Sequence, residues 1–127
     1  MQLGMVGLGR MGGNMAERLR AAGHDVVGYD TNPELSQVPD LAGLVERLTD
    51  SPRVVWVMVP VQFLDQVLDD LGALLSEGDI VIDGGNSRWT GDAPRAEKLA
   101  ARGVRFIDCG VSGGVWGTEY GYALMCG

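Results

Sequence analysis

Positively charged residues are scarce in this sequence. Its 127 residues include 10 Lys and Arg against 17 Asp and Glu, which gives a formal net charge of −7 at pH 7. Proteins that bind nucleic acids or anionic membrane surfaces carry clusters of basic side chains that attract phosphate groups. We therefore expect neither a nucleic acid nor a membrane among the partners of this chain.

Cysteine and histidine are also rare. The two cysteines, Cys109 and Cys126, stand apart and belong to no C-x-x-C or Cys/His pattern. This usage predicts no zinc or other metal site and no disulfide framework, and it is typical of a reducing compartment, the cytoplasm. The single histidine, His24, follows a glycine, where a solvated turn residue is a better interpretation than a catalytic base.

Long apolar runs are missing too. No run is long enough to cross a membrane, and the N-terminus lacks the basic region of a secretory signal. Apolar residues still make up 46% of the chain, which suits the core of one domain but leaves little for a second lobe. We expect residues 1–127 to form a single domain.

Glycine, by contrast, is abundant, and three glycines near the start have a functional spacing. Gly7, Gly9 and Gly12 form G-x-G-x-x-G between an apolar run, residues 3–6, and a helical pattern. The first glycine of this motif permits a tight turn, the second lets the backbone approach a pyrophosphate, and the third allows close packing of helix on strand. The pattern predicts an anion at the start of the helix.

Hydrophobic periodicity predicts a Rossmann-type, doubly wound α/β fold with a mainly parallel sheet. The segment 30–53 offers one short helix, 41–48, and several prolines, too little for a third strand and its helices. We therefore expect a pruned connection between the second and fourth strands and the order 2-1-4-5-6 in the conventional numbering. Strands are expected at 3–6, 26–29, 54–59, 80–82 and 104–108, with a further candidate at 120–125.

Two helices are predicted in the second half of the chain. In residues 63–75, apolar residues beginning with Phe63 recur at helical spacing and are assigned to the core, and the acidic residues to a solvated face. Residues 92–102 form another helix. It carries the only lysine, Lys98, which is interpreted as a solvated surface residue.

Polar or glycine-rich loops follow four of the predicted strands, at residues 7–12, 30–32, 83–87 and 112–114. Ligands of open α/β sheets bind at the carboxyl ends of the strands, so these loops are expected to converge on one site. Asn86 offers it a donor and an acceptor, and Ser112 a hydroxyl. An Asn-stabilised turn and a flexible glycine loop are the alternatives.

Asp30 ends the predicted second strand, close to the offset of roughly 20 residues at which an acid accepts hydrogen bonds from an adenosine ribose. It would repel a 2′-phosphate, and no Lys or Arg occurs in the next four residues. The cofactor is therefore expected to be NAD, with NADP disfavoured. A role confined to capping a turn is the alternative for Asp30.

Three segments, residues 7–16, 82–87 and 111–117, together resemble the N-terminal domain of 6-phosphogluconate dehydrogenase, and in particular its shorter, NAD-preferring branch. The resemblance covers nearly the whole chain. Related 3-hydroxyisobutyrate dehydrogenases typically have a Ser-Thr pair where this chain has Gly85, Asn86 and Ser87, so Asn86 favours the sugar acid. A β-hydroxyacid dehydrogenase domain and a non-catalytic dinucleotide-sensing module are the alternatives.

The resemblance implies oxidative decarboxylation of 6-phosphogluconate to ribulose 5-phosphate with NAD. Its motifs assign substrate contacts to Asn86, Ser112, Gly113 and Gly114. Val61 and Gln62 depart from the Ala-Gly of many relatives. The implied cofactor-binding residues are Gly7, Leu8, Gly9, Arg10, Met11, Gly12, Asp30, Val59, Pro60, Val61 and Asn86.

Catalysis, by the same resemblance, needs residues that this sequence does not contain. The family's general base is a lysine and its acid a glutamate, both in a helical C-terminal domain absent from the 127 residues. We therefore expect no catalytic residue in this chain, NAD binding without turnover, and an exposed apolar surface that promotes self-association. The full-length enzyme is expected to be a homo-oligomer.

Overall fold

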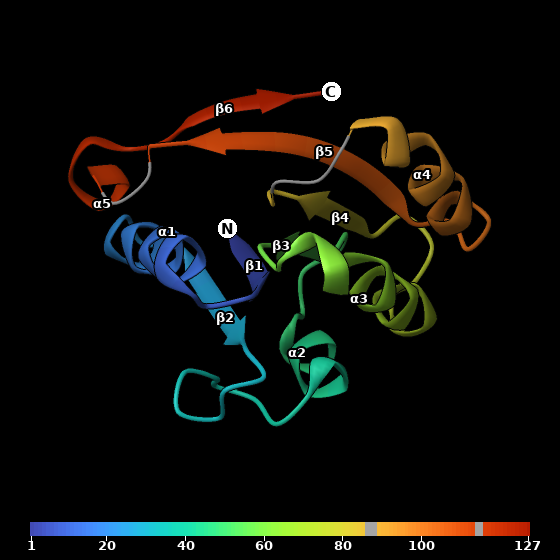
Figure 1. Ribbon diagram of the computed structural model, residues 1–127. Coiled ribbons are helices and arrows are strands. Elements are labelled where there is room, and N and C mark those ends of the chain that lie inside the picture. Colours follow the sequence, from blue (N-terminus) through green and yellow to red (C-terminus); the bar gives the residue numbers. More distant parts are fainter. Residues whose placement is uncertain (86–88, 114–115) are drawn as a thin grey trace.

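The computed structural model describes residues 1–85, 89–113 and 116–127. It shows one twisted sheet with helices on both faces (Figure 1). The elements in chain order are β1 (Gln2–Val6), α1 (Arg10–Ala21), β2 (Asp25–Tyr29), α2 (Leu41–Arg47), β3 (Val54–Val57), α3 (Val61–Leu74), β4 (Ile80–Asp83), the short 3₁₀ helix η1 (Trp89–Gly91), α4 (Asp92–Ala100), β5 (Arg105–Ser112), α5 (Gly117–Tyr120) and β6 (Ala123–Cys126).

The sheet has the order β2-β1-β3-β4-β5-β6. Strands β2 to β5 in this order pair in parallel, and β6 pairs antiparallel with β5 at the edge. Residues 30–53 contain the short helix α2 and no strand. The predicted order 2-1-4-5-6 is therefore confirmed, with β3, β4 and β5 in the conventional fourth, fifth and sixth places, and β6 is the additional strand.

Two apolar layers hold the helices against the sheet. Alternate residues of β1 point to opposite faces, as strand geometry requires. Met5 packs with Met15 of α1 on one face. Val6 packs on the other face, in a cluster that includes Leu44 of α2 and Leu64 of α3. Helix α1 thus covers one side of the sheet, and α2, α3 and α4 cover the other.

The end of the chain differs from the sequence prediction. Residues 109–112, expected to be a loop, continue strand β5 because β6 pairs with them, Cys109 opposite Cys126 and Ser112 opposite Ala123. Cys109 and Cys126 form a disulfide, so the expectation of unpaired cysteines was wrong. The physical reason is the antiparallel register of β6, which brings together two cysteines whose spacing in the sequence matches no motif.

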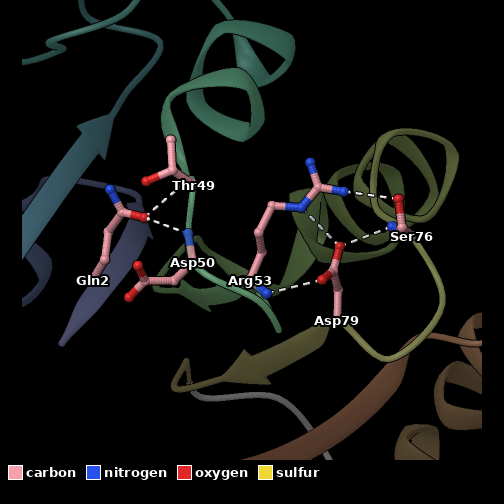
Figure 2. A network of polar contacts seen from close by, with 6 residues as sticks. All are labelled: Gln2, Thr49, Asp50, Arg53, Ser76 and Asp79. Atoms are coloured by element: carbon pink, nitrogen blue, oxygen red, sulfur yellow. Dashed lines mark hydrogen bonds and ion pairs between the residues drawn. The ribbon is translucent and has the colours of Figure 1, made fainter.

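A polar network closes the amino-terminal edge of the sheet, away from the carboxyl ends of the parallel strands (Figure 2). Asp79, 5% exposed, accepts hydrogen bonds from the Arg53 backbone N–H (2.8 Å), Arg53 Nε (2.9 Å) and the Ser76 N–H (2.8 Å). Nearby, Gln2 Oε1 accepts from the backbone N–H of Thr49 at 2.7 Å. These contacts fix the segments that enter β3 and β4.

Candidate functional site

A cavity of about 770 Å³ opens at the carboxyl edge of the parallel strands. Its volume is in the range of small-molecule and cofactor sites. The glycine turn after β1, the end of β2, the turn from β3 into α3, and Gly84 and Gly85 after β4 all contribute to its wall. Three of the four predicted loops therefore converge on one site.

The three motif glycines meet different surroundings. Gly7 has φ +94°, and a Cβ there would lie 2.6 Å from the Met58 carbonyl oxygen. A Cβ on Gly12 would collide with the Gly7 carbonyl oxygen, whereas one on Gly9 would meet nothing within 4 Å. Gly7 and Gly12 thus permit the turn and the close packing, and Gly9 leaves open space on the cavity wall.

That open space lies at the N-terminus of α1. Gly9 is the N-cap residue, and no side chain makes a capping hydrogen bond there. The N–H groups of the first helical turn have no partner within a helix and carry a partial positive charge. The cradle left open by Gly9 and these donors fits the pyrophosphate of a dinucleotide.

Asp30, half-buried on the cavity wall, links the glycine turn to β2. One carboxylate oxygen accepts from the Leu8 N–H at 2.7 Å, and the other accepts from the Asn32 N–H at 2.8 Å. Asp30 therefore does cap the turn. It also lines the cavity, together with Thr31. Each carboxylate oxygen can accept more than one hydrogen bond, so the geometry also suits a ribose diol.

Most of the predicted cofactor residues come together around this cavity. Leu8 contributes its N–H to Asp30, while its side chain faces Gly28. Asn86 lies outside the described residues. The predicted cofactor residues that line the cavity are Gly7, Gly9, Arg10, Met11, Gly12, Asp30, Val59, Pro60 and Val61.

The predicted substrate loop is less close to the cavity. Ser112 and Gly113 are exposed at the end of β5, and among the described residues of β5 only Val111 lines the cavity. Gly114 lies outside the described residues. On β4, the buried Asp83 accepts a hydrogen bond from the Gly85 N–H at 2.9 Å, which holds the turn that carries the cavity-lining glycines.

Helices α2 and α3 supply a part of the wall that sequence reasoning missed. Phe63 was assigned to the core, and this was wrong: it is 56% exposed and faces the cavity. Helical spacing cannot separate a side chain on the core from one on the wall of an adjoining cavity. The missed wall residues on these helices are Leu41, Phe63, Gln66, Val67 and Asp70.

An acidic cluster lies between β4, β5 and α4. One carboxylate oxygen each of Asp83, Asp92 and Asp108 lies within 4.8 Å of the others. Burial raises the pKa of the Asp108 carboxyl above its ordinary value, and the negative charges of Asp92 and Asp83 raise it further. Three neighbouring carboxylates by themselves do not define a metal site, and we assign no ion to them.

Lys98 and His24, the two other side chains considered for catalysis, do not line the cavity. Lys98 is exposed on α4, as predicted. On the same helix, Arg95 Nε donates to Asp65 Oδ1 at 2.9 Å, a hydrogen bond that lowers the pKa of Asp65. His24 Nδ1 lies 3.1 Å from the amino group of Met1. None of the helices in the described segments combines the length and apolar content needed to cross a bilayer.

A sheet of this order with an anion cradle at the first crossover defines a Rossmann-type dinucleotide-binding domain. The family model described as the NAD binding domain of 6-phosphogluconate dehydrogenase matches residues 2–127. The chain belongs to this family. NAD as the cofactor, expected from Asp30, agrees with this assignment.

Two curated relatives illustrate the match. The NAD(+)-dependent, decarboxylating 6-phosphogluconate dehydrogenase of Haloferax volcanii is 42% identical over 100% of this chain and 44% of its own length. The decarboxylating 6-phosphogluconate dehydrogenase of Haemophilus influenzae is 35% identical over 98% of this chain and 29% of its own length. This chain thus spans less than half of each of these relatives.

Solved structures agree on the fold. A 3-hydroxyisobutyrate dehydrogenase of Mycobacterium tuberculosis, described with L-serine, has a TM-score of 0.84 and 27% identity over 99% of this chain and 46% of that chain. The 6-phosphogluconate dehydrogenase of Plasmodium falciparum has a TM-score of 0.75 and 24% identity over 99% of this chain and 30% of that chain. The second likeness concerns the fold alone.

Proposed function

We propose that this chain is the NAD-binding domain of an enzyme that oxidatively decarboxylates 6-phosphogluconate to ribulose 5-phosphate. The observation that carries the proposal is Asp30 on the wall of the same cavity as the glycine turn. The name of the Haloferax volcanii relative, NAD(+)-dependent and decarboxylating, supports both the cofactor and the reaction.

In this proposal NAD, when bound, would supply the hydride acceptor: the hydride leaves carbon C3 of the substrate, and the proton of the C3 hydroxyl passes to the general base. The glycine turn of residues 7–12 holds the pyrophosphate, Asp30 accepts hydrogen bonds from the adenosine ribose, and residues 59–61 form the apolar wall that excludes water. Asn86 contacts the nicotinamide ribose and the substrate. Ser112, Gly113 and Gly114 bind the carboxylate and hydroxyl end of the substrate.

Residues 1–127 form one dinucleotide-binding domain, and the general base and acid come from a helical domain outside this sequence. Two observations support this division of roles. The only lysine, Lys98, is exposed on α4, and the relatives are more than twice as long as this chain. We therefore expect these 127 residues to bind NAD and to produce no NADH.

Titration of the chain with NAD and NADP by calorimetry tests the cofactor. NAD is expected to bind more tightly, because a 2′-phosphate would approach the Asp30 carboxylate. Comparable or tighter binding of NADP contradicts the proposal. Addition of 6-phosphogluconate after NAD is expected to raise the melting temperature without an absorbance increase from NADH, and robust NADH production would contradict the division of roles.

A β-hydroxyacid dehydrogenase for a smaller substrate is the second candidate. The likeness to the Mycobacterium tuberculosis 3-hydroxyisobutyrate dehydrogenase, with a TM-score of 0.84, favours it. The residue that separates the two, Asn86, lies outside the described residues. A melting shift with 3-hydroxyisobutyrate but not with 6-phosphogluconate would select this candidate, and no shift with either would favour a dinucleotide-sensing module.

The environment of the protein is also a proposal. The net charge of −7 supports a protein that binds neither nucleic acid nor an anionic membrane. Its similarity to dehydrogenases of metabolism supports a cytoplasmic location. Because a disulfide is unusual in a reducing compartment, trapping the thiols in intact cells tests this location.

Exposed apolar side chains on and beside α5 and β6 support self-association of the chain and a homo-oligomeric full-length enzyme. These side chains are Trp116, Tyr120, Leu124 and Met125. Analytical ultracentrifugation that shows only monomer at high concentration would count against self-association.

A further inference from the structure

One face of α3 lines the cavity, and its Val67 also packs against the core. Phe63, Gln66, Val67 and Asp70 are all part of the cavity wall, and their spacing of three, four and seven residues places them on one side of a helix. Gln66 and Asp70 are exposed, as is Phe63. The face therefore offers a ligand an aromatic ring, an aliphatic side chain and a polar pair.

This face of α3 adjoins helix α2 and shares the cavity with the end of β2. Helix α2 packs against both β2 and α3, and Leu41 at the start of α2 shares the cavity with Asp30 and the α3 face. Gly84, Gly85 and Val111 line the cavity from β4 and β5, which β1 and β3 separate from β2 in the strand order. A base attached to a ribose at Asp30 would therefore meet the α3 face.

The polar pair has a defined orientation. Gln66 Nε2 donates to Asp70 Oδ1 at 2.9 Å. Because a carboxylate only accepts hydrogen bonds, Asp70 fixes which end of the Gln66 amide carries the nitrogen. Within the described parts of the chain, Gln66 Oε1 accepts no hydrogen bond, and the amide nitrogen keeps a second N–H. Gln66 thus offers one acceptor and one donor side by side.

That pair of groups complements adenine. A glutamine amide can accept from the N6 amine of adenine and donate to the neighbouring ring nitrogen. A 6-oxopurine such as hypoxanthine carries an oxygen in place of the amine, so two acceptors would face each other. We propose that Gln66, positioned by Asp70, makes this cavity selective for a dinucleotide with a 6-aminopurine base. This inference rests on the proposed NAD function.

Calorimetric titration of the chain with NAD and with nicotinamide hypoxanthine dinucleotide tests the proposal. We expect NAD to bind about fivefold or more tightly, since one base-specific glutamine pair contributes about 1–3 kcal/mol. The Gln66→Met variant is expected to bind the two dinucleotides equally. Gln62→Met is the matched control, because Gln62 is exposed on the same helix and is expected to keep the wild-type ratio.

Asp70→Asn tests the positioning role, because an amide at that position accepts or donates and no longer fixes the orientation of Gln66. The ratio of the two affinities is expected to fall while the melting temperature stays unchanged. Equal affinities of the wild-type chain for both dinucleotides overturn the inference and leave the NAD function standing. If the chain binds neither dinucleotide, both the inference and the NAD function are overturned. If Gln66→Met leaves the ratio of affinities unchanged, the inference is overturned, and the hydrogen bond between Gln66 and Asp70 only stabilises the helix.

Discussion

At the scale of single residues, Gly9 and Gly12 belong to the same motif but have opposite surroundings. The space beside Gly9 is open to the cavity, while Gly12 is buried against the Gly7 carbonyl oxygen. Both positions are glycines of the same sequence motif, and the motif does not show which of the two borders the ligand-binding site. The structure separates the two roles, because only Gly12 has backbone where a side chain would be.

Gly9→Ala and Gly12→Ala are therefore expected to fail in different ways. Gly12→Ala should lower the free energy of unfolding by about 1–3 kcal/mol, the cost of overpacking, as the added methyl forces α1 away from the turn. Gly9→Ala should lower the free energy of unfolding by no more than about 1 kcal/mol, since alanine can adopt the backbone conformation of Gly9. It should weaken NAD binding, because the added methyl group occupies space on the cavity wall. Urea denaturation and calorimetry check the pair. Equal stability of the two variants would contradict this explanation.

At the scale of elements, the two edges of the sheet have separate tasks. The cavity occupies the carboxyl edge, and the network of Arg53 and Asp79 holds the amino edge (Figure 2). Sequence reasoning found the strands and the loops at the carboxyl edge, because their apolar runs and glycines are local signals. It did not find the network, since Arg53 and Asp79 become neighbours only when β3 and β4 pair.

Asp79→Ala is expected to lower the free energy of unfolding by about 3–5 kcal/mol. The substitution leaves the Arg53 guanidinium, 22% exposed, without its carboxylate partner. NAD affinity should remain unchanged at temperatures where the variant is folded, because the network lies at the opposite edge from the cavity. Asp65→Ala is the control: Asp65 is 67% exposed in its ion pair with Arg95, so its loss should cost about 1 kcal/mol or less.

The disulfide between β5 and β6 gives a second prediction at this scale. Cys109 and Cys126 are separated by 17 residues in the sequence, and closing a loop of that size stabilises a fold by about 3 kcal/mol in the chain-entropy description. Reduction, or the Cys126→Ser substitution, should therefore lower the melting temperature. An identical melting temperature with and without reductant would show that the disulfide contributes nothing.

At the scale of the whole molecule, the excess of acidic groups makes stability depend on pH. Burial raises the pKa of Asp108 in the folded state, with the charges of Asp92 and Asp83 adding to it. The folded protein therefore holds this proton more tightly than the unfolded chain does. The stabilisation is present below the unfolded pKa and is lost as the pH rises through the folded pKa.

Asp108→Asn, which cannot ionise, is expected to be more stable than the wild type at pH 7, and the difference should shrink or reverse as the pH falls toward the unfolded pKa, about 3.9. Denaturation at a series of pH values measures this difference. Asp69→Asn, an exposed site on α3, serves as the control for net charge. A difference that stays constant with pH would exclude titration of Asp108 as the cause.

The sequence by itself determined the Rossmann order, the glycine turn and Asp30, because each depends on residues close together in the chain. It could not determine the disulfide, the extension of β5 through Ser112 or the exposure of Phe63. Those features depend on the register of β6 and on the cavity that Leu41 of α2 shares with α3, which exist only once distant segments pack. The local sequence therefore predicted the position of the cavity, at the carboxyl ends of the strands beside the glycine turn and Asp30. Only the tertiary structure showed that α2 and α3 form part of its wall.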